Sequence, residues 1–338
     1  MRRSLLRLSI PLREPFVTAS GVVQSRELAV IRLEDDDGTV GFGEAAPLTP
    51  YDGVSIDDVW DALREGPPER GAPPQARAAW ELAELDLQAR RRGRPLGEPG
   101  ADAIPVNRTL PAGPPQETAA RARDGVRAGF SCFKVKVGLP DDVQRVAAVR
   151  DAVGSWPAIR LDANGAWGVD EAAERIAALA AYDLQLVEQP CATLEELARL
   201  RELVEVPIAA DEPIATADDV RRAAELGACD VINVKLSGSG GYRPARELVR
   251  EAARHDLRVF LSSTLDGPWG IAAALQLAAS ERVSLACGLA TLELFDARIA
   301  RALSPPRAGL VQVPEGPGLG VEVDEDALAE VVVDEVHK

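Results

Sequence analysis

Residues 133–137 read Phe133-Lys134-Val135-Lys136-Val137, an apolar strand pattern in which every second residue is a lysine. The chain has 38 Lys plus Arg but only four lysines, and three of them lie in its interior, at 134, 136 and 235. An arginine stays protonated in a protein, whereas a lysine loses its proton when it is desolvated or lies near other positive charge. Alternation along a strand places both lysines of this stretch on one face. We therefore expect a site that needs titratable amines, with carboxylates or a metal nearby to balance their charge.

Short apolar runs recur on both sides of this stretch at an interval of about 26 residues, the spacing of a β-α unit. The runs begin near Ile104, Cys132, Ala158, Leu184, Pro207, Asp230, Leu257 and Val283. Thr193-x-x-Glu196 and Thr216-x-x-Asp219 lie between runs and are typical helix starts. Eight strands alternating with helices predict an α/β fold with a (β/α)8-type barrel over residues 101–304. A doubly wound sheet is the alternative, but it would not bring the polar strand ends together on one ring.

The first hundred residues predict a separate α+β domain. The expected elements are strands at 27–34 and 40–44, a hairpin turn at 35–38, and helices at 55–64 and 74–92. The Gly- and Pro-rich segment 93–100 marks the end of this domain, which we place at residues 1–100. Part of the tail, about 305–338, is expected to return to it.

Composition bounds the partners of the chain. The formal net charge of -16 argues against nucleic acid and against an anionic membrane as a partner. The four cysteines form no C-x-x-C pair, so we expect reduced, buried thiols. No apolar run is long enough for a signal or membrane segment, and we expect a soluble cytoplasmic protein. The two histidines, at 255 and 337, do not follow predicted strands, which makes histidine acid-base catalysis a poor explanation.

Three consecutive predicted strands each end at a carboxylate: Asp162, Glu188 and Asp211. In a β/α barrel the carboxyl ends of all strands meet at one mouth, so these groups are expected to converge there, with lysines on both sides. A single acidic residue at a strand end is more often a helix cap. The set of three beside the rare lysines favours a site for Mg²⁺, which prefers carboxylate oxygens and retained waters.

The motifs on these strands resemble the enolase superfamily, and within it the muconate-lactonizing subgroup. They are Lys134-Val135-Lys136, Asp162-Ala163-Asn164, Glu188-Gln189-Pro190, Ala210-Asp211-Glu212 and Lys235, and the resemblance covers essentially the whole chain. It implies a capping domain followed by the barrel, with Asp162, Glu188 and Asp211 binding Mg²⁺, for which Mn²⁺ can substitute. It also implies that Lys136 and Lys235 face each other across a small-molecule carboxylate substrate, with the metal stabilising an enediolate.

Within the subgroup, residues 187–193 and 286–291 resemble the o-succinylbenzoate synthases of menaquinone biosynthesis. Dipeptide epimerases carry an Asp-x-Asp at the eighth strand to hold a substrate ammonium, where this chain has Gly288-Leu289-Ala290. The segment 16–21 and the loop 47–53 resemble the capping loops of racemases as much as those of the synthases. An N-acylamino acid (N-succinylamino acid) racemase or a dipeptide epimerase of the same superfamily therefore remains an alternative, and a non-catalytic anion-binding barrel ranks last.

The resemblance gives the residues definite roles. Lys136 is expected to remove the proton α to the carboxylate of 2-succinyl-6-hydroxy-2,4-cyclohexadiene-1-carboxylate, in a dehydration to o-succinylbenzoate. Lys235 supplies a second cation, and Lys134 makes loss of a proton from Lys136 easier by adding a like charge beside it. Further substrate contacts are expected from Asn164, Glu212, Ser262, Ser263, Gly288 and Ser20.

Overall fold

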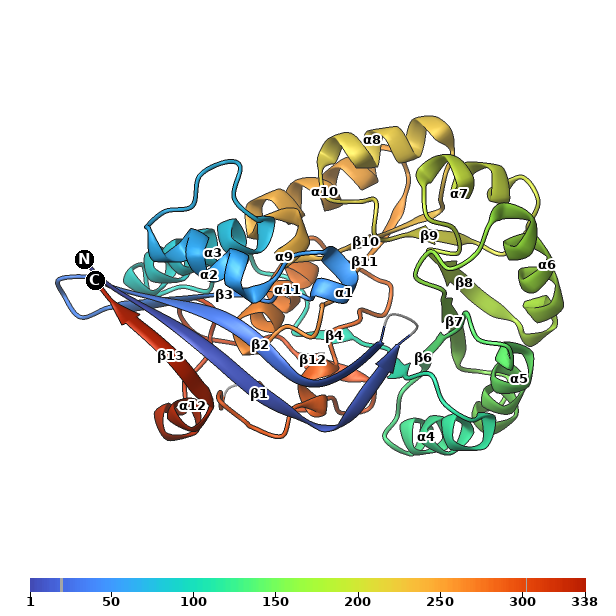
Figure 1. The fold of residues 1–338 in the computed structure, drawn as a ribbon, viewed down its shortest axis with the longest axis horizontal. Helices are drawn as coiled ribbons and strands as arrows, with labels where there is room; N and C mark the ends of the chain where they lie inside the picture. Colours follow the sequence, from blue (N-terminus) through green and yellow to red (C-terminus); the bar gives the residue numbers. More distant parts are fainter. Residues whose placement is uncertain (19–20, 302) are drawn as a thin grey trace.

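The computed structural model describes residues 1–18, 21–301 and 303–338, and Figure 1 shows them as two joined parts. The first part is built on a four-stranded antiparallel sheet with the order β13-β1-β2-β3. Its strands are β1 (Arg2–Thr18), β2 (Gly21–Glu34), β3 (Val40–Ala45) and β13 (Val332–His337). The predicted hairpin turn is confirmed, because the Gly38 N–H donates to Asp35 O at 3.0 Å and Gly38 has a φ of 82°. β13 forms one edge of the sheet, so the two ends of the chain meet there (Figure 1).

Helices cover one face of this sheet and give it a core of its own. They are α2 (Ile56–Arg64) and α3 (Pro74–Arg91), which agree with the predicted helices, and the short α1 (Thr49–Asp52) that precedes them buries no residue. α3 lies unusually close to β3 because Gly43 has no side chain: a Cβ there would lie 1.8 Å from Ala79 O. This close contact fixes the sheet against the helix, and the capping part is therefore α+β, as predicted.

The second part is a seven-stranded parallel sheet with the order β11-β10-β9-β8-β7-β6-β5. Figure 1 shows it curved into an open barrel with helices on its outer side. The strands are β5 (Arg108–Leu110), β6 (Cys132–Lys136), β7 (Ala158–Asp162), β8 (Leu184–Glu188), β9 (Ile208–Ala210), β10 (Val231–Val234) and β11 (Arg258–Leu261). The main helices are α4 (Pro115–Arg127), α5 (Asp142–Val153), α6 (Val169–Leu179), α7 (Leu194–Arg201), α8 (Ala217–Leu226), α10 (Tyr242–Arg254) and α11 (Pro268–Ser280).

Short elements complete the chain. They are β4 (Ala103–Pro105), η1 (Ala180–Tyr182), α9 (Leu236–Ser239), η2 (Thr291–Leu294), β12 (Leu310–Gln312) and α12 (Glu325–Val331). β12 pairs antiparallel with β4 in a separate two-stranded sheet. The capping boxes predicted at Thr193 and Thr216 are confirmed at the starts of α7 and α8, where each threonine accepts from the backbone N–H three residues later.

The eighth predicted strand, expected to begin near Val283, is wrong as a regular strand. The chain here makes only isolated parallel bridges, Cys287 with Val106 and Gly288 with Ser262. The Gly288 N–H donates to Leu261 O at 2.8 Å and the Asn107 N–H donates to Cys287 O at 3.0 Å, so two residues still join both edges of the sheet. The apolar run begins at the end of α11, where the Val283 N–H donates to Ala278 O, and its apolar side chains pack into the main core without forming a continuous strand.

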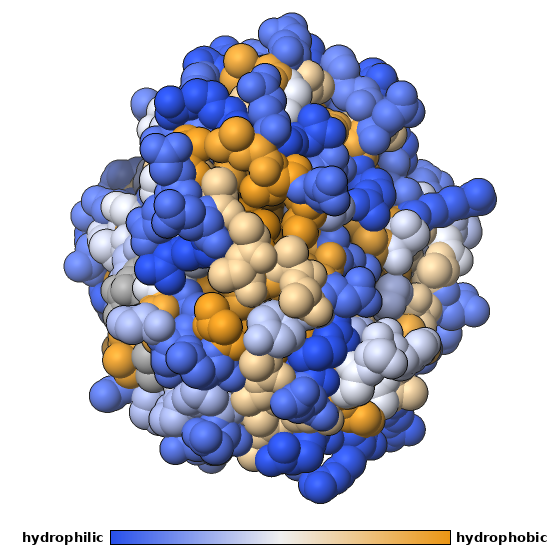
Figure 2. Space-filling model, turned by 90° about the vertical axis from the view of Figure 1, so that its right-hand side faces the viewer, coloured by the Kyte–Doolittle hydropathy of each residue, from blue (hydrophilic) through white to orange (hydrophobic). Residues whose placement is uncertain are grey.

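The side of the barrel that carries α5, α6 and α7 faces the viewer in Figure 2, and its surface is largely hydrophilic around a central apolar strip. Amphipathic helices of this kind bury one face against the sheet and leave the polar face in water. None of the helices in the described part of the chain is both long and apolar enough to span a bilayer.

The two parts are joined by a buried apolar contact. The Trp269 side chain, at the start of α11, is fully buried and stacks on Phe42 of β3 with the ring centroids 5.6 Å apart. Apolar packing is therefore the role of this tryptophan, and it fixes the barrel against the capping sheet close to the mouth of the barrel.

Candidate active site

Three neighbouring strands place a buried carboxylate at the mouth of the barrel. Asp162 ends β7, Glu188 ends β8, and Asp211 follows β9; their exposed fractions are 1%, 0% and 4%. Asp162 and Glu188 are register partners in the parallel sheet, so their side chains emerge at the same height. Burial of carboxylates is costly unless cations or hydrogen-bond donors compensate for it.

The three internal lysines supply that compensation. Lys134 Nζ lies 2.8 Å from both Asp162 Oδ2 and Glu188 Oε1. Lys136 Nζ lies 2.6 Å from Asp162 Oδ2, and Lys235, which follows β10, pairs with Asp211 from the other side. The lysines of β6 therefore do face one side of the strand, and all three amines meet the strand-end carboxylates.

Burial and neighbouring charges shift the pKa values of these groups in different directions. Burial opposes the charged form of Lys134, but Asp162 and Glu188 raise its pKa above the ordinary value. Burial also acts against ionised Asp162, yet the ammonium groups of Lys134 and Lys136 lower the pKa of this carboxyl. Glu188 goes the other way: burial raises its pKa, and the Lys134 charge only partly offsets the effect. Lys134 thus favours its charged form, which suits it to balancing negative charge better than to removing a proton.

The fit of this site to a divalent metal can be judged from its oxygens. Among the described residues no three His, Cys, Asp or Glu side chains are gathered closely enough to enclose a metal as they stand. Lys134 instead bridges Asp162 and Glu188. However, Glu188 Oε2 is buried and accepts no hydrogen bond, and carboxylate oxygens are the ligands that Mg²⁺ takes. The donor set therefore fits a hard cation in its chemistry, once the side chains turn from the lysines toward the ion.

Backbone strain marks the ends of β7 and β8. Asn164 and Gln189 have φ values of 46° and 40°, a left-handed region that residues other than glycine seldom occupy. The turn at Asn164 lets its Oδ1 accept from Lys136 Nζ at 2.7 Å. Gln189 Oε1 accepts from the Asp211 N–H at 2.7 Å and thereby fixes the next strand end. Such strain is typical of sites where side chains must be aimed at a reacting group.

Asn233 of β10 connects the carboxylates to the substrate side of the site. Its Nδ2 donates to Glu188 Oε1 at 2.9 Å, and its Oδ1 accepts from Ser262 Oγ at 2.8 Å. Asn233 is 1% exposed, so this relay is protected from water. It holds both the carboxylate and the serine hydroxyl in one orientation.

A cavity of about 130 Å³ lies above these groups, between the barrel and the capping part. The barrel side of it carries Lys134, Lys136, Asp162, Asn164, Asp211 and Lys235. The capping part contributes an apolar wall of Phe16, Val22, Val23, Leu48 and Pro50, together with Tyr51. The cavity thus has a charged floor and an apolar roof, which suits a small acid with a hydrocarbon body.

The substrate contacts predicted from sequence have different positions. Asn164, Ser262, Ser263 and Gly288 line the cavity. Gly288 leaves needed space, because a Cβ there would lie 2.8 Å from the Ser262 Cβ. Glu212 acts one step away, since its Oε1 accepts from Asn164 Nδ2 at 2.9 Å. Ser20 lies outside the described residues.

Tyr51 is a site residue that the sequence did not single out. Lys235 Nζ donates to its hydroxyl oxygen at 2.7 Å and also lies 4.6 Å from the ring centroid. Burial, followed by the charge of Asp211, raises the pKa of Tyr51 well above its ordinary value, so the hydroxyl stays protonated. The only sequence feature that pointed toward Tyr51 was the loop 47–53, which resembles the capping loops of related enzymes. That resemblance did not indicate which side chain of the loop contacts a lysine.

Arg26 joins two walls of the cavity from behind. Its side chain is 3% exposed and donates hydrogen bonds to main-chain oxygens of both parts. On the barrel side, Nε and Nη2 donate to Thr264 O at 3.2 and 3.0 Å. On the capping side, Nη1 donates to Pro47 O at 2.6 Å and Nη2 donates to Ala46 O at 2.8 Å. Pro47 precedes the capping segment that carries Tyr51, and Thr264 follows the two serines of the barrel. Arg26 therefore sets the distance between the roof and the floor of the cavity.

Two buried carboxyl groups lie beside this arginine. Glu44 Oε1 accepts from the Gly267 N–H at 2.6 Å, at the start of α11. Asp266 Oδ1 accepts from the N–H and the hydroxyl of Thr264 at 3.1 and 2.9 Å. Burial, and then the charge of Asp266, raises the pKa of Glu44 to about 8. Burial also raises the pKa of Asp266, so both carboxyl groups of this joint hold a proton more readily than they would in water.

Comparison with known proteins identifies the architecture. The family described as Enolase C-terminal domain-like matches residues 117–327. The o-succinylbenzoate synthase of Thermobifida fusca (strain YX) is 37% identical over 332 residues, which is 96% of this chain and 90% of that protein.

Two solved structures have the same fold over their whole length. N-succinyl Arg/Lys racemase from Bacillus cereus has a TM-score of 0.95 at 25% identity, covering 100% of this chain and 99% of that one. The dipeptide epimerase from Cytophaga hutchinsonii, solved with Mg and the dipeptide D-Ala-L-Val, has a TM-score of 0.93 at 27% identity with the same coverage. With its capping sheet, its parallel barrel and the matched family domain, this chain belongs to the enolase superfamily, in the mandelate racemase and muconate-lactonizing enzyme subgroup.

Proposed function

We propose that this enzyme dehydrates 2-succinyl-6-hydroxy-2,4-cyclohexadiene-1-carboxylate to o-succinylbenzoate, a step of menaquinone biosynthesis. The observation that carries the proposal is the difference in similarity. In sequence the chain is 37% identical to the Thermobifida fusca synthase, against 31% to the hydrophobic dipeptide epimerase of Enterococcus faecalis and 26% to the N-succinyl-L-Arg/Lys racemase of Bacillus cereus.

The lining of the cavity supports a substrate without a free ammonium group. Asp162 and Asp211 are the acidic residues that line it among the described residues, and each is already paired with a lysine. An ammonium would need an unpaired carboxylate there, as in recognition of a dipeptide amine. The apolar roof and the hydroxyl groups of Ser262 and Ser263 suit a hydrocarbon ring with a second, hydrogen-bonded acid group.

In the proposed mechanism Lys136 is the base. Asp162 Oδ2 and Asn164 Oδ1 hold its Nζ at the edge of the cavity. From this position Lys136 removes the proton α to the substrate carboxylate, and its ammonium then gives a proton to the departing hydroxyl group. One C–H and one C–O bond break, water leaves, and the ring becomes aromatic. The same proton serves both halves of the reaction, so the site needs no second acid.

The remaining charged residues stabilise and orient. Lys235, held by Tyr51 and Asp211, presents a second cation to the cavity without removing a proton. Lys134 stays protonated between Asp162 and Glu188 and offsets their charge. Asp162, Glu188 and Asp211 would hold Mg²⁺, or Mn²⁺ in its place, and the bound ion would supply Lewis-acid stabilisation of the negative charge that develops on the substrate carboxylate. The free, buried cysteines support a cytoplasmic location.

The racemisation of N-succinylamino acids is the second candidate. It is favoured by one observation: Lys136 and Lys235 come from strands on either side of the three carboxylates and both line the cavity, an arrangement in which each could serve one enantiomer. The test is a side-by-side assay of the purified, Mg²⁺-loaded protein with the cyclohexadiene acid and with N-succinylamino acids. Faster dehydration is the expected result. Racemisation with the higher kcat/KM would overturn the proposed function.

A further inference from the structure

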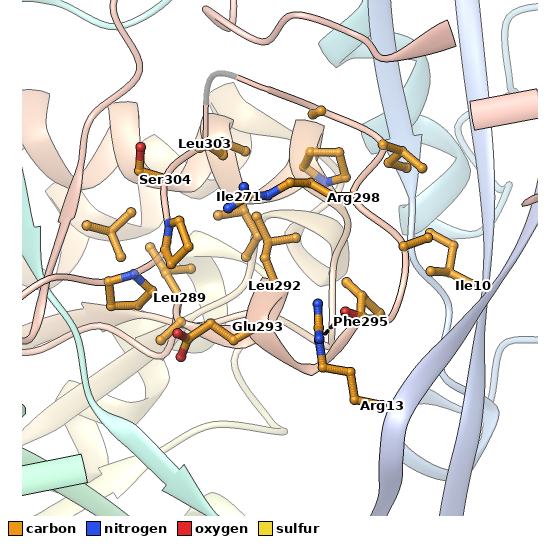
Figure 3. A pocket seen from close by; sticks show the side chains of 18 of the residues that line it. Ile10, Arg13, Ile271, Leu289, Leu292, Glu293, Phe295, Arg298, Leu303 and Ser304 are labelled. Carbon is orange, nitrogen blue, oxygen red and sulfur yellow. Dashed lines mark hydrogen bonds between the residues drawn. The ribbon is translucent and has the colours of Figure 1, made fainter. Parts of the chain in front are cut away.

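A second cavity, larger than the catalytic one, lies where β1, the start of α11 and residues 289–300 and 303–306 meet (Figure 3). Its volume is about 570 Å³, within the range of roughly 300–1,000 Å³ that small-molecule sites occupy. It shares no lining residue with the catalytic cavity among the described residues. None of the chemistry proposed above uses it.

The walls of this cavity are tied to regular structure. Leu12 of β1 forms a bridge with Phe295, and the Asp296 N–H donates to Pro11 O at 2.9 Å. Arg13 Nε donates to Phe295 O at 2.9 Å and fixes the same segment a second time. On the other side lies Ile271 of α11, which is 1% exposed.

The lining is apolar in its body and basic at its edge. Ile271, Leu289 and Leu292 form the apolar floor in Figure 3. Arg298 extends over the hollow beside Ile271, and the guanidinium of Arg13 rises into the same space from β1. A third arginine, Arg108, also lines the cavity, but its charge is balanced by Glu293 at 2.9 Å.

The edge of the second cavity is positively charged, whereas the molecule as a whole is negatively charged. The chain carries a net charge of -16, yet the cavity is lined by three arginines and one glutamate. Neither Arg13 nor Arg298 forms a salt bridge with a carboxylate of the described residues. A planar guanidinium binds a carboxylate through two parallel hydrogen bonds, and two such groups above an apolar hollow match an acid with a hydrocarbon tail.

We propose that this cavity is a second binding site, which takes an amphipathic monocarboxylate with its acid group on Arg13 and Arg298 and its hydrocarbon body against Ile271, Leu289 and Leu292. The bound acid would contact the segment 288–292, which forms a wall of both cavities. Leu289 and Leu292 face this cavity, whereas Gly288 and Thr291, their neighbours in the chain, face the catalytic one. Thr291 Oγ1 is also 2.8 Å from Ser263 Oγ, so the shared wall reaches the proposed substrate contacts.

The test uses octanoate as the probe and isothermal titration calorimetry as the measurement, on the Mg²⁺-loaded full-length protein. The double variant Arg13→Gln/Arg298→Gln should weaken octanoate binding at least tenfold, which corresponds to about 1.4 kcal/mol. Both side chains are exposed, and although the variant loses the bond from Arg13 to Phe295 O, the Leu12–Phe295 bridge and the bond from Asp296 to Pro11 still hold this wall, so the fold should be kept, which a thermal melt checks. The matched control is Arg301→Gln/Arg307→Gln, which removes the same charge from two exposed arginines of the adjoining chain and should leave the affinity unchanged.

Two further measurements locate the probe. Octanamide, which has the same tail without the charge, should bind at least tenfold more weakly than octanoate if the arginines recognise the acid. Leu48→Trp fills the catalytic cavity from the capping side and should leave octanoate binding intact, because Leu48 lines the catalytic cavity and not the second one. The proposal is overturned if the wild-type protein shows no binding, if the control variant loses affinity as much as the Arg13/Arg298 variant, or if Leu48→Trp abolishes binding.

Discussion

Replacement of Arg26 by Met tests whether the joint between the two parts positions the catalytic cavity. Methionine keeps most of the length of the side chain and removes all of its donors. Thr264 O and Pro47 O receive no other hydrogen bond from the described residues, whereas Ala46 O also accepts from the Thr264 hydroxyl. Each buried carbonyl left without a partner costs about 1–3 kcal/mol, so two of them cost about 2–6 kcal/mol.

One effect works in the opposite direction. Burial lowers the pKa of Arg26, which means that the folded protein carries a desolvation cost for this guanidinium, and the variant removes it. We therefore expect the loss of stability to fall near the lower end, at about 2–4 kcal/mol. Urea denaturation followed by circular dichroism measures it. Arg301→Met, whose side chain is 67% exposed, is the matched control and should change stability by less than about 0.5 kcal/mol.

The same variant should impair catalysis in a particular way. Pro47 begins the segment that carries Tyr51, and Thr264 follows Ser262 and Ser263. Without Arg26 the roof and the floor of the cavity should therefore shift relative to each other. KM should rise at a temperature where the variant is fully folded, and Arg26→Lys, which keeps the charge, should give an intermediate value. If KM and kcat of the folded Arg26→Met protein match those of the wild type, the joint stabilises the fold without positioning the site, and the reasoning fails.

Three further predictions concern the site and the joint. If Asp162, Glu188 and Asp211 hold the metal, EDTA should abolish activity and Mg²⁺ or Mn²⁺ restore it, and Glu188→Gln should weaken metal binding without unfolding the barrel; full activity of rigorously metal-free protein would refute the assignment. Lys136→Arg keeps the positive charge but removes the base, so the rate of dehydration should fall by at least ~10²–10⁴-fold. Lys235→Arg should keep measurable dehydration activity. An equal and near-complete loss of activity in both variants would mean that Lys235 also transfers protons. Because the pKa of Glu44 is raised to about 8 in the folded state, its protonation contributes stability that is fully present below about pH 4.5 and is lost as the pH rises through 8. Glu44→Gln should flatten this part of the stability profile in urea denaturation between pH 5 and 9, and an unchanged slope would show that another group is responsible.

The parts of the molecule that the sequence predicted depend on local patterns. The strands β6 to β11 each follow from a short apolar run, and the carboxylates at their ends follow from parallel strands opening at one mouth. The predicted strand near Val283 failed because its role is met by two single bridges, at Cys287 and Gly288, and an apolar run alone does not distinguish these cases.

The contacts between the capping part and the barrel could not be predicted in the same way. Tyr51 and Lys235 are 184 residues apart in the chain, and Arg26 and Thr264 are 238 residues apart. Neither pair has a periodicity, a spacing or a motif that links its members. They meet because the two parts pack together through surfaces such as Phe42 and Trp269, and that docking is a property of the whole fold.

The pairing of β1 with β13 has a consequence for the order in which the molecule is completed. Ser4 and His337 are bonded across this pair although they are 333 positions apart, so β13, the partner of β1, is synthesised only after the whole barrel. At ~5–20 residues per second, one edge of β1 stays open for tens of seconds while the barrel folds. An open strand edge is a template for pairing with other chains, and arginines at positions 2, 3 and 7 of β1 place charge along it. The capping sheet that roofs the active site is therefore closed only after the barrel beneath it has been made, and a nascent chain shorter than about 332 residues should be the species most prone to aggregate.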